Sequence, residues 1–342
     1  MTTLRDVAAQ VGGVSVSTVS RALTGHPHVD EELRSRIQTA ARSLDYRPNA
    51  HARALRQRQS RTIGLVLPDI VNITYAAGSA VLQRIFQRYG YNVALFVTDN
   101  DPAVERDCLQ RLSEQQVDGI IHVPCTSSGA RMLDRAGDRI PVVELFRHSQ
   151  GGRFDCVIAD DEQSAYQVIE HLATLGHRRI GVIAGDAEFS TTGHRLAGIT
   201  RALQDFAIDP EHCPVMTGSY SREWGARAFT ELLRMPDRPT AVFATSSEFV
   251  LGALLATTTQ GVRLPDQVSL AGLGDPDWYS VVSAPVTSYS LPLEEMGMAA
   301  AQLLVSRISQ EPQRGWKPTS LTVAGHFAVR DSTGPPVPAG TP

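Results

Sequence analysis

Three polar side chains near the N-terminus have the types and spacing of residues that contact nucleic acid. Ser17, Thr18 and Arg21 follow a Gly12-Gly13 break within one short stretch. Hydroxyl and guanidinium groups donate hydrogen bonds to base edges and to phosphate oxygens. Spacing alone leaves an alternative open, because an ordinary solvent-exposed helix face carries the same residue types.

A second group of cationic side chains lies in residues 49–61, a stretch without any acidic residue. Leu55 is its one large apolar residue, and a leucine among arginines suits insertion into a minor-groove base step. An isolated helix of this length is at best marginal in water, so we expect the stretch to fold only against a partner. The alternative is a flexible basic linker. Its arginines are Arg53, Arg56, Arg58 and Arg61.

Polar and aromatic side chains follow several short apolar runs farther along the chain. In an open parallel sheet, ligands bind at the carboxyl ends of the strands, so these positions are candidate ligand contacts. Their mixture of polar groups and rings suits a small polar ligand such as a sugar. Taken singly, residues such as Asp69 or Ser246 are more often caps or turn residues. The candidates are Asp69, Asn72, Phe146, Arg147, Asp160, Arg195, Tyr220, Ser246 and Asp275.

Three short helices are expected to position the N-terminal side chains. In the second helix Val16, Val19 and Leu23 form one apolar stripe, which is expected to turn inward and leave the three polar side chains outside. Two helices joined by a glycine-containing turn, the second with exposed polar side chains, are the arrangement of a helix-turn-helix. A capping residue precedes each helix, namely Thr3, Ser15 and Asp30.

Short apolar runs alternate with helical segments from residue 62 onward. β-branched runs that are separated by crossovers predict parallel, doubly wound sheets. The alternation continues for longer than one such sheet needs, so we expect two α/β subdomains that face each other across a cleft. A late strand at 321–329 is expected to complete the second subdomain. The other predicted strands are 62–67, 92–97, 119–123, 142–145, 157–159, 179–184, 215–217, 241–244 and 268–273.

Charge is distributed unevenly over the 342 residues, whose formal net charge is −4. Residues 1–60 contain nine arginines and five acidic residues, a net charge of +4, which leaves −8 for the remainder. A basic head on an acidic body indicates that the head is the part that meets a polyanion.

Several classes of protein are disfavoured by what the sequence lacks. No apolar run approaches the roughly 18 residues of a membrane span and the N-terminus has no signal-peptide pattern, so no membrane partner and a cytoplasmic location are expected. The four cysteines form no C-x-x-C pair, and His26 and His28 lack a third ligand nearby, so no metal site is expected. Motifs for nucleotide binding or hydrolytic catalysis are missing, so neither a cofactor nor an enzyme is expected.

Three N-terminal segments resemble the DNA-binding head and hinge of the lactose-repressor (LacI/GalR) family. They are Thr3-Leu-Arg-Asp-Val-Ala-Ala, Val14-Ser-Val-Ser-Thr-Val-Ser-Arg-Ala-Leu and Leu44-Asp-Tyr-Arg-Pro-Asn-Ala-His-Ala-Arg-Ala-Leu. The resemblance implies that Val16, Ser17 and Arg21 read bases and that Leu55 is a minor-groove wedge. It further implies DNA contacts in phosphate or positioning roles for Thr18, Ser20, Tyr46 and Asn49, and Arg56 lies in the same DNA-binding segment.

The resemblance continues into the acidic part of the chain, for example at Ile63-Gly-Leu-Val-Leu-Pro-Asp and Glu170-His-Leu-Ala-Thr-Leu-Gly-His-Arg-Arg-Ile. It implies a core that is similar to a periplasmic sugar-binding protein. Family effector positions fall on Asn72, Phe146, Arg195, Tyr220, Ser246 and Asp275. Arg195 would pair with ligand oxygens, Tyr220 would stack on the ligand, and Asp275 would accept a hydrogen bond.

Departures from the family pattern leave the ligand open. Phe146 stands where many members have aspartate, Ser246-Ser247 where Asn-Asp is frequent, and Gly274 where an aspartate usually precedes Asp275. The turn at Gly12-Gly13 holds one residue more than the family turn, which would tilt the second helix and alter its base contacts.

The sequence therefore predicts a small all-α helix-turn-helix head and a periplasmic-binding-protein-like α/β body. The expected limits are 1–48 for the head, 49–61 for a hinge helix, 62–331 for the two-subdomain effector-binding body and 332–342 for a disordered tail. The predicted function is a homodimeric transcriptional repressor that binds a near-palindromic operator and responds to a sugar-like metabolite. The alternatives are a binding protein of the same fold without sequence-specific DNA recognition and, less favoured, a sugar-processing enzyme.

Overall fold

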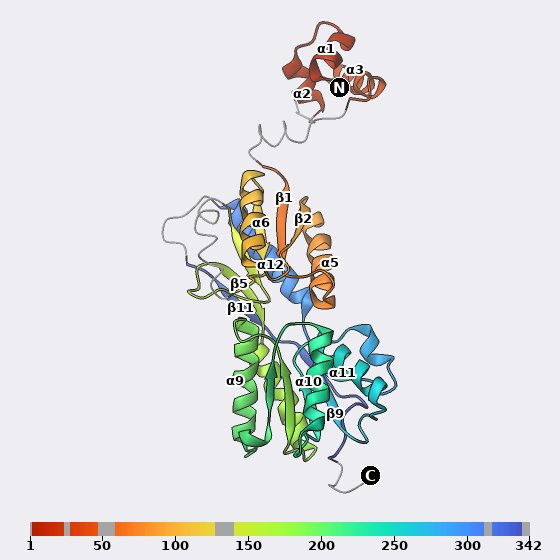
Figure 1. Cartoon of the computed structure of the whole chain (residues 1–342). Helices are drawn as coiled ribbons and strands as arrows, with labels where there is room; N and C mark the ends of the chain where they lie inside the picture. The colour runs from red at the N-terminus through yellow and green to blue at the C-terminus, as the bar shows by residue number, and fades with distance from the viewer. Residues whose placement is uncertain (1, 24–27, 47–58, 127–139, 311–316, 337–342) are drawn as a thin grey trace. The chain divides into compact units, whose positions relative to one another are not determined.

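The computed structural model describes the chain apart from residues 1, 24–27, 47–58, 127–139, 311–316 and 337–342 (Figure 1). The chain divides into two compact units, Met1–Ser60 and Arg61–Pro342. We call them the head and the body. The helix expected in the hinge falls on 49–61, of which 49–58 lie outside the described residues.

The head contains α1 (Leu4–Val11), α2 (Val16–Leu23) and α3 (Glu31–Ser43). Thr3 and Asp6 form the expected capping box, and the Asp30 carboxylate accepts hydrogen bonds from the second and third backbone amides of α3. Gly12 and Gly13 both have positive φ angles, +74° and +69°, which is why glycine suits the turn between α1 and α2. The three helices share one small apolar core that includes Val7, Val19 and Ile37.

Two sheets form the centre of the body. The first is wholly parallel, in the order β11-β5-β4-β3-β1-β2, and the second has the order β12-β10-β9-β8-β6-β7 with only β12 antiparallel. The first sheet consists of β1 (Thr62–Leu67), β2 (Asn92–Val97), β3 (Gly119–His122), β4 (Val142–Leu145), β5 (Asp155–Ala159) and β11 (Ser320–Val323). The second consists of β6 (Ile180–Ala184), β7 (Val215–Thr217), β8 (Ala241–Ala244), β9 (Ser269–Leu273), β10 (Thr287–Ser290) and β12 (His326–Ala328).

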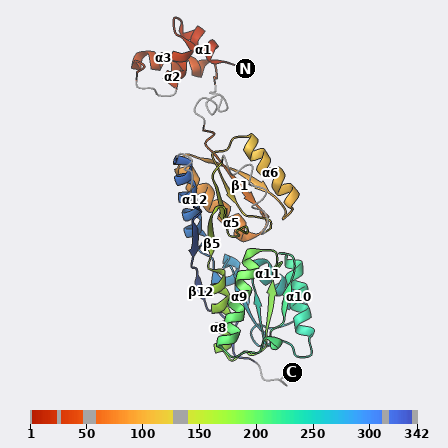
Figure 2. The same ribbon diagram turned by 90° about the vertical axis from the view of Figure 1, so that its left-hand side faces the viewer.

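Helices cover both faces of each sheet, so the predicted doubly wound architecture is confirmed. On the first sheet, α5 (Ile73–Arg88) and α12 (Leu293–Ser309) pack on one face and α6 (Pro102–Glu114) on the other. On the second sheet, α8 (Asp161–Thr174) and α9 (Ser190–Asp205) pack opposite α10 (Arg222–Arg234) and α11 (Ser247–Gln260). Figure 2 shows α8 and α10 on opposite sides of this sheet.

Three connections join the two sheets and make the cleft between them part of one unit. They run from β5 to α8, from β10 to α12 and from β11 to β12. After β10 the chain returns to the first subdomain. For this reason α12, drawn in blue in Figure 1, packs beside α5 although the two helices are far apart in sequence. Ligand-binding crevices of such folds lie between subdomains at the carboxyl ends of the strands.

Two expectations about the C-terminal part are wrong. The single strand expected at 321–329 is two strands, β11 in the first sheet and β12 in the second. Gly325 lies between β11 and β12 and interrupts the strand. A Cβ atom at this position would lie only 1.9 Å from the Ser290 carbonyl oxygen. The tail expected to be disordered from residue 332 begins with ordered residues, because Ser332 is fully buried and Gly334 accepts hydrogen bonds from Ser269 and from His177.

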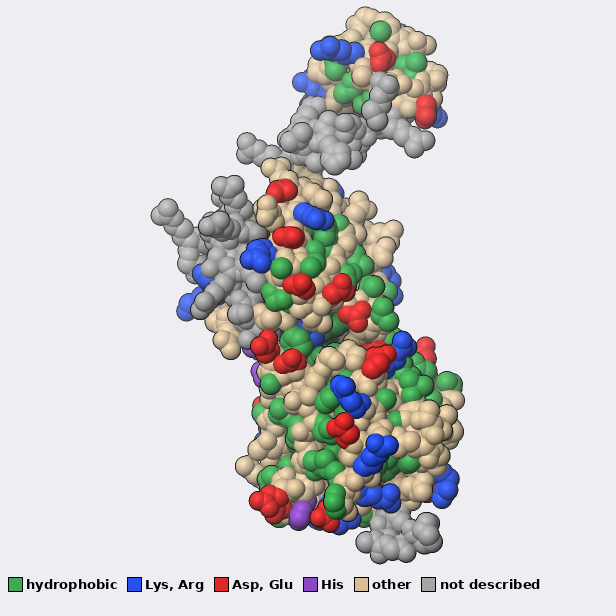
Figure 3. Space-filling view, viewed as in Figure 1, with side chains coloured by type: hydrophobic (Ala, Val, Ile, Leu, Met, Phe, Trp, Pro, Cys, Tyr) green, Lys and Arg blue, Asp and Glu red, His purple; other side chains and the backbone are tan. Residues whose placement is uncertain are grey.

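No helix in the described ranges combines the length and the apolar character that crossing a membrane requires. On the face of the body shown in Figure 3, acidic and basic side chains are interspersed.

Candidate effector cavity and DNA-binding head

The N-terminus of α2 is fixed by hydroxyl groups. The Ser15 Oγ atom accepts a hydrogen bond from the Thr18 backbone amide at 3.1 Å, so Ser15 caps α2 as predicted. The same Oγ atom lies 2.7 Å from Ser17 Oγ and 2.9 Å from Thr18 Oγ1. Ser17 and Arg21 are exposed and Thr18 and Ser20 are partly buried. An exposed hydroxyl and guanidinium on one short helix can contact base edges.

One expectation about α2 is wrong. Val16 is 39% exposed, whereas its spacing with Val19 and Leu23 predicted an inward side chain. Val19 is fully buried, and Leu23 packs against the same core in a partly buried position. Val16 is the first residue of α2 and lies outside the apolar core of the head, so helical periodicity overestimates its burial. An exposed Val16 is compatible with the base contact that the family resemblance implies.

Of the remaining predicted DNA contacts, the structure describes only Tyr46. Tyr46 is partly buried and packs against the core of the head. Asn49, Leu55 and Arg56 lie outside the described residues.

A cavity lies inside the body at the carboxyl ends of strands from both sheets. Five of the six predicted effector residues line it: Asn72, Phe146, Arg195, Tyr220 and Ser246. Its volume is about 50 Å³, enough for a few water molecules and well below the roughly 300 Å³ at which ligand pockets usually begin. A sugar-sized ligand therefore requires the walls to move apart.

Arg195 and Asp161 form a buried ion pair in the wall of the cavity. Arg195 Nε donates to Asp161 Oδ1 at 2.7 Å, and Arg195 Nη1 donates to the Thr245 carbonyl oxygen at 2.8 Å. Asp161 is the first residue of α8, and Arg195 lies in the second turn of α9. Burial raises the pKa of the Asp161 carboxyl, and the charge of Arg195 opposes that shift. The pair holds the guanidinium plane in place at the cavity surface.

Arg147 is a second buried cation in the same wall and is 3% exposed. Its guanidinium carbon lies 3.8 Å above the centre of the Phe189 ring, which is the distance of a close cation–π contact. Arg147 Nη1 donates to Asn100 Oδ1 at 2.9 Å and to the Pro124 carbonyl oxygen at 3.4 Å.

A tight turn after β4 presents Phe146 and Arg147 to the cavity. The Arg147 amide donates to the Leu145 carbonyl oxygen at 2.7 Å, and Phe146 has a φ of +63°. This is a three-residue turn with a backbone conformation that costs free energy for a residue other than glycine. The Phe146 ring packs edge to face against Tyr75, with 5.6 Å between ring centroids.

Tyr220 provides an aromatic wall. Its ring stacks on Phe249 with centroids 5.2 Å apart and an interplanar angle of 23°. Close approach to Gly185 permits this position, because a Cβ atom there would lie 2.0 Å from the ring. The Tyr220 hydroxyl is 3.3 Å from Thr192 Oγ1 and 3.5 Å from Arg195 Nη1, so it has polar neighbours at the cavity.

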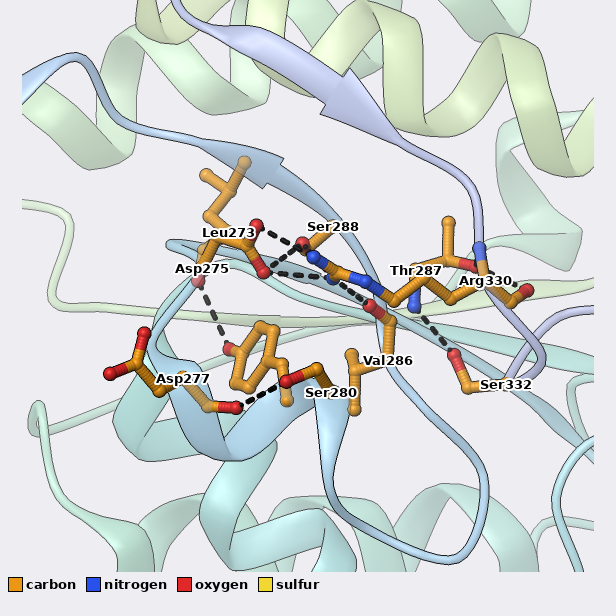
Figure 4. Close-up of polar contacts among 10 residues, drawn as sticks. Leu273, Asp275, Asp277, Ser280, Val286, Thr287, Ser288, Arg330 and Ser332 are labelled. Atoms are coloured by element: carbon orange, nitrogen blue, oxygen red, sulfur yellow. Dashed lines mark hydrogen bonds and ion pairs between the residues drawn. The ribbon is translucent and has the colours of Figure 1, made fainter.

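Asp275 is the predicted effector residue that does not line the described cavity. Figure 4 shows its carboxylate engaged by Arg330, with Nη1 to Oδ1 at 2.8 Å and Nη2 to Oδ2 at 2.7 Å. Ser288 Oγ also donates to Asp275 Oδ1, at 3.0 Å. The carboxylate links Ser288 on β10 to Arg330 after β12 and does not line the cavity. The expected role of Asp275 as a ligand acceptor is therefore not supported.

Sequence reasoning identified Asp69 and Asp160 as strand-end residues; Asp69 is a turn residue and Asp160 is the N-cap of α8. Asp69 accepts from the Val71 amide at 2.7 Å, and Asp160 accepts from the Gln163 amide at 3.0 Å. It missed Asp161, Thr191 and Thr245, which line the cavity. An aspartate directly after a predicted strand and before a helix was the available signal for Asp161, although the adjacent Asp160 carried the same signal.

Comparison with known proteins accounts for almost the whole chain. Residues 3–49 match the profile of "Bacterial regulatory proteins, lacI family". Residues 60–327 match that of "Periplasmic binding proteins and sugar binding domain of LacI family". The chain is 30% identical to the ribose operon repressor of Haemophilus influenzae, over 97% of this chain and 98% of the relative.

Two solved structures show the same architecture. The lac repressor dimer bound to operator and the anti-inducer ONPF is 25% identical and superposes with a TM-score of 0.86, covering 97% of this chain and 99% of that one. A LacI family transcriptional regulator from Enterococcus faecium with bound ribose is 26% identical and has a TM-score of 0.71, covering 80% of this chain and 98% of that one.

The fold and the two sites define a ligand-responsive DNA-binding regulator. The chain belongs to the LacI family of bacterial transcriptional regulators.

Proposed function

We propose that the protein is a repressor that binds a near-palindromic operator as a homodimer and whose operator affinity is set by a small, sugar-like metabolite in the cavity of the body. The observation that carries the proposal is the cavity itself, where Arg195, Tyr220 and Ser246 converge from different elements of the second subdomain. Side chains from both subdomains line it, so ligand binding and subdomain movement are physically linked.

The head supports operator binding through α2. We assign base contacts to Val16, Ser17 and Arg21 and backbone or positioning contacts to Thr18, Ser20, Tyr46 and Asn49. Leu55 and Arg56 are assigned to the minor groove. A dimer carries two such heads, and two-fold symmetry of the protein requires a near two-fold repeat in the DNA.

The relatives support both the repressor role and the ligand class. The Haemophilus influenzae relative is named a ribose operon repressor, and the Enterococcus faecium structure holds ribose. The lac repressor structure is a dimer on its operator. A family that consists of transcriptional regulators favours regulation over a sugar-processing enzyme.

Selection from a pool of random DNA duplexes tests the DNA-binding half of the proposal. The full chain is expected to enrich one near-palindromic sequence and to bind it at least 10³-fold more tightly than a scrambled duplex at the same salt concentration. Failure to enrich any sequence would instead favour a binding protein without sequence-specific DNA recognition.

Titration of the selected operator in the presence and absence of D-ribose and its derivatives tests the ligand-responsive half. At least one of them is expected to change operator affinity. The scrambled duplex is the control, since a sugar acting through the cavity leaves non-specific binding to the DNA backbone unchanged.

A further inference from the structure

The cavity of the body has an excess of positive charge. Among the described residues that line it, the charged side chains are Arg147, Arg195 and Asp161. Arg195 and Asp161 pair with each other at 2.7 Å, which leaves Arg147 without an acidic partner among these lining residues. Burial raises the pKa of Asp161, and protonation of that carboxyl only increases the positive charge of the cavity.

Arg147 has only neutral partners in the part of the chain that the structure describes. An amide oxygen and a backbone carbonyl accept hydrogen bonds from one of its nitrogens, Nη1. Three aromatic rings surround the guanidinium, with centroids 3.8 Å away at Phe189, 5.5 Å at Tyr220 and 5.9 Å at Tyr75. A buried cation without a counter-ion is costly, although hydrogen bonds and ring faces offset part of that cost.

Several acidic groups near the lining residues in sequence are engaged elsewhere. Asp69 accepts hydrogen bonds from the backbone amides of its own turn. Asp160 caps α8, and Asp275 is held by Arg330 in a two-point ion pair. The residue directly before Arg147 is Phe146, whose ring packs on Tyr75. None of these three carboxylates pairs with Arg147 in the described part of the chain.

We propose that the ligand of this cavity carries an anionic group, a phosphate or a carboxylate, and that Arg147 binds it. This inference rests on the proposed function of the cavity and narrows its ligand from sugar-like metabolites to acidic sugars or sugar phosphates. The planar guanidinium binds two oxygens of either group at once, and a water-poor site strengthens that contact. Arg195 and Tyr220 remain to contact the uncharged part of the ligand.

Isothermal titration of the full chain with matched probes tests the inference. The probes are D-ribose, D-ribose 5-phosphate, D-ribonate and inorganic phosphate, each at the same ionic strength. At least one of the two charged sugars is expected to bind roughly tenfold or more tightly than ribose, a ratio typical of one charge-assisted contact. Tighter binding of ribose 5-phosphate indicates a phosphate ligand, and tighter binding of ribonate indicates a carboxylate ligand.

Substitution of Arg147 identifies the group responsible. Arg147→Gln is expected to remove the preference for the charged sugar, and Arg147→Lys, which keeps the charge but loses the planar fork, is expected to retain part of it. Arg201→Gln is the matched control. Arg201 lies on α9, where its side chain is 43% exposed and pairs with Glu162, so its removal is expected to leave the preference unchanged. Thermal unfolding of each variant confirms that it is folded.

Three outcomes overturn the inference: ribose binding as tightly as both charged sugars, a preference that survives in Arg147→Gln, or no binding of any charged probe. The proposed function fails separately. A charged sugar that binds through Arg147 without changing operator affinity contradicts ligand control of the operator. Ribose that binds as tightly as both charged sugars and changes operator affinity supports the proposed function and contradicts the anionic ligand.

Discussion

The Arg195–Asp161 pair shows how one buried contact can serve position more than stability. Removing two charges from water costs about as much free energy as their attraction returns, so an intact buried pair adds little net stability. Its geometry is nevertheless fixed by a 2.7 Å bond to Asp161 and a 2.8 Å bond to the Thr245 carbonyl oxygen. A ligand therefore meets a guanidinium that is already oriented.

Breaking this pair on one side is expected to be far more harmful than removing it entirely. Arg195→Met leaves a buried carboxylate without its partner and should lower the free energy of unfolding by about 3–5 kcal/mol. Arg195→Met combined with Asp161→Asn should recover more than half of that loss. Denaturant unfolding of the parent and both variants measures the difference. Equal destabilisation of the single and double variants would show that the ion pair is not the cause.

Arg21 is the residue on α2 whose loss should most weaken operator binding. Its side chain is exposed, and one specific contact between a side chain and a base contributes about 1–3 kcal/mol of discrimination, a factor of about 5–150. Arg21→Ala should therefore lower affinity for the selected operator by that factor and reduce its discrimination against a scrambled duplex. Arg42→Ala on α3 is the matched control, since it also removes an exposed arginine from the head. Similar losses of discrimination in both variants would contradict the assignment of α2 as the reading helix.

Residue types at strand ends predicted most of the residues that line the cavity, but not which side chains form ion pairs with one another. Asn72, Arg195, Tyr220 and Ser246 lie where strand-end reasoning and the family resemblance placed them. Asp275 does not, because its partner Arg330 is 55 positions away and meets it only after β12 has paired with β10. Spacing along the chain carries no information about such a contact.

At the scale of elements, periodicity predicted the parallel strands and failed where the chain changes sheets. Each predicted strand from 62–67 to 268–273 coincides with or overlaps an observed strand. β10 was missed because Thr287–Ser290 is a run of polar residues and tyrosine without an apolar pattern. The 321–329 run was read as one strand although it contains Gly325, because an isolated glycine within a strand pattern can also mark a bulge. The division between β11 and β12 depends on which sheet each half joins.

Residues 332–334, which follow β12, form hydrogen bonds that hold strands of the second sheet together. Ser332 Oγ donates to the Leu270 carbonyl oxygen at 2.6 Å and accepts from the Thr287 amide at 2.8 Å (Figure 4 shows the second contact). Thr333 Oγ1 lies 2.8 Å from Thr287 Oγ1, and the Gly334 amide donates to Ser269 Oγ at 3.0 Å. These contacts join the segment to β9 and β10.

Truncation after Asp331 should therefore destabilise the body. Its buried partners on β9 and β10 lose their hydrogen bonds at about 1–3 kcal/mol each, so a loss of several kcal/mol is expected. Truncation after Pro336, which removes only residues 337–342, is the control and should leave the unfolding transition unchanged. Denaturant unfolding measures both. A chain ending at Asp331 that is as stable as the parent would restore the expectation of a dispensable tail.

The contacts of residues 333 and 334 with two histidines should make the stability of the body sensitive to acid. Desolvation lowers the pKa of His171 and of His177, and His177 Nε2 donates to the Gly334 carbonyl oxygen at 2.9 Å. A histidine whose folded pKa is below its unfolded value contributes stability above the unfolded pKa and loses it as pH falls through the folded pKa. The free energy of unfolding should accordingly decrease as pH falls below about 6.5, the unperturbed pKa of histidine.

Comparison with a double variant isolates this acid effect. His171→Gln combined with His177→Gln should be less stable than the parent at pH 7 but lose less further stability between pH 7 and pH 5. Denaturant unfolding at each pH provides the values. Parallel pH profiles for the parent and the double variant would assign the acid sensitivity to other groups.

At the scale of the whole molecule, function requires that two separate units communicate. The head and the body have their own apolar cores, and the net charge of +4 on residues 1–60 contrasts with −8 on the rest. The basic unit is suited to DNA and the acidic unit is not. Ligand in the body can alter DNA binding only if its binding free energy differs between the DNA-bound and DNA-free states.

Linkage makes this communication reciprocal, and that reciprocity is the strictest test of the whole-molecule proposal. If a sugar probe changes operator affinity by some factor, saturating operator must change affinity for the same probe by that factor, in the same direction. A factor of about 5–150 is expected from typical coupling free energies of 1–3 kcal/mol. Operator titrations with and without probe give one value, and calorimetric titrations of probe with and without operator give the other. The cavity of about 50 Å³ must widen to admit a sugar, so the state that binds the probe differs in structure from the one described here. Equal probe affinity with and without operator, alongside a probe-dependent operator affinity, would mean that the probe acts outside this equilibrium and not through the cavity.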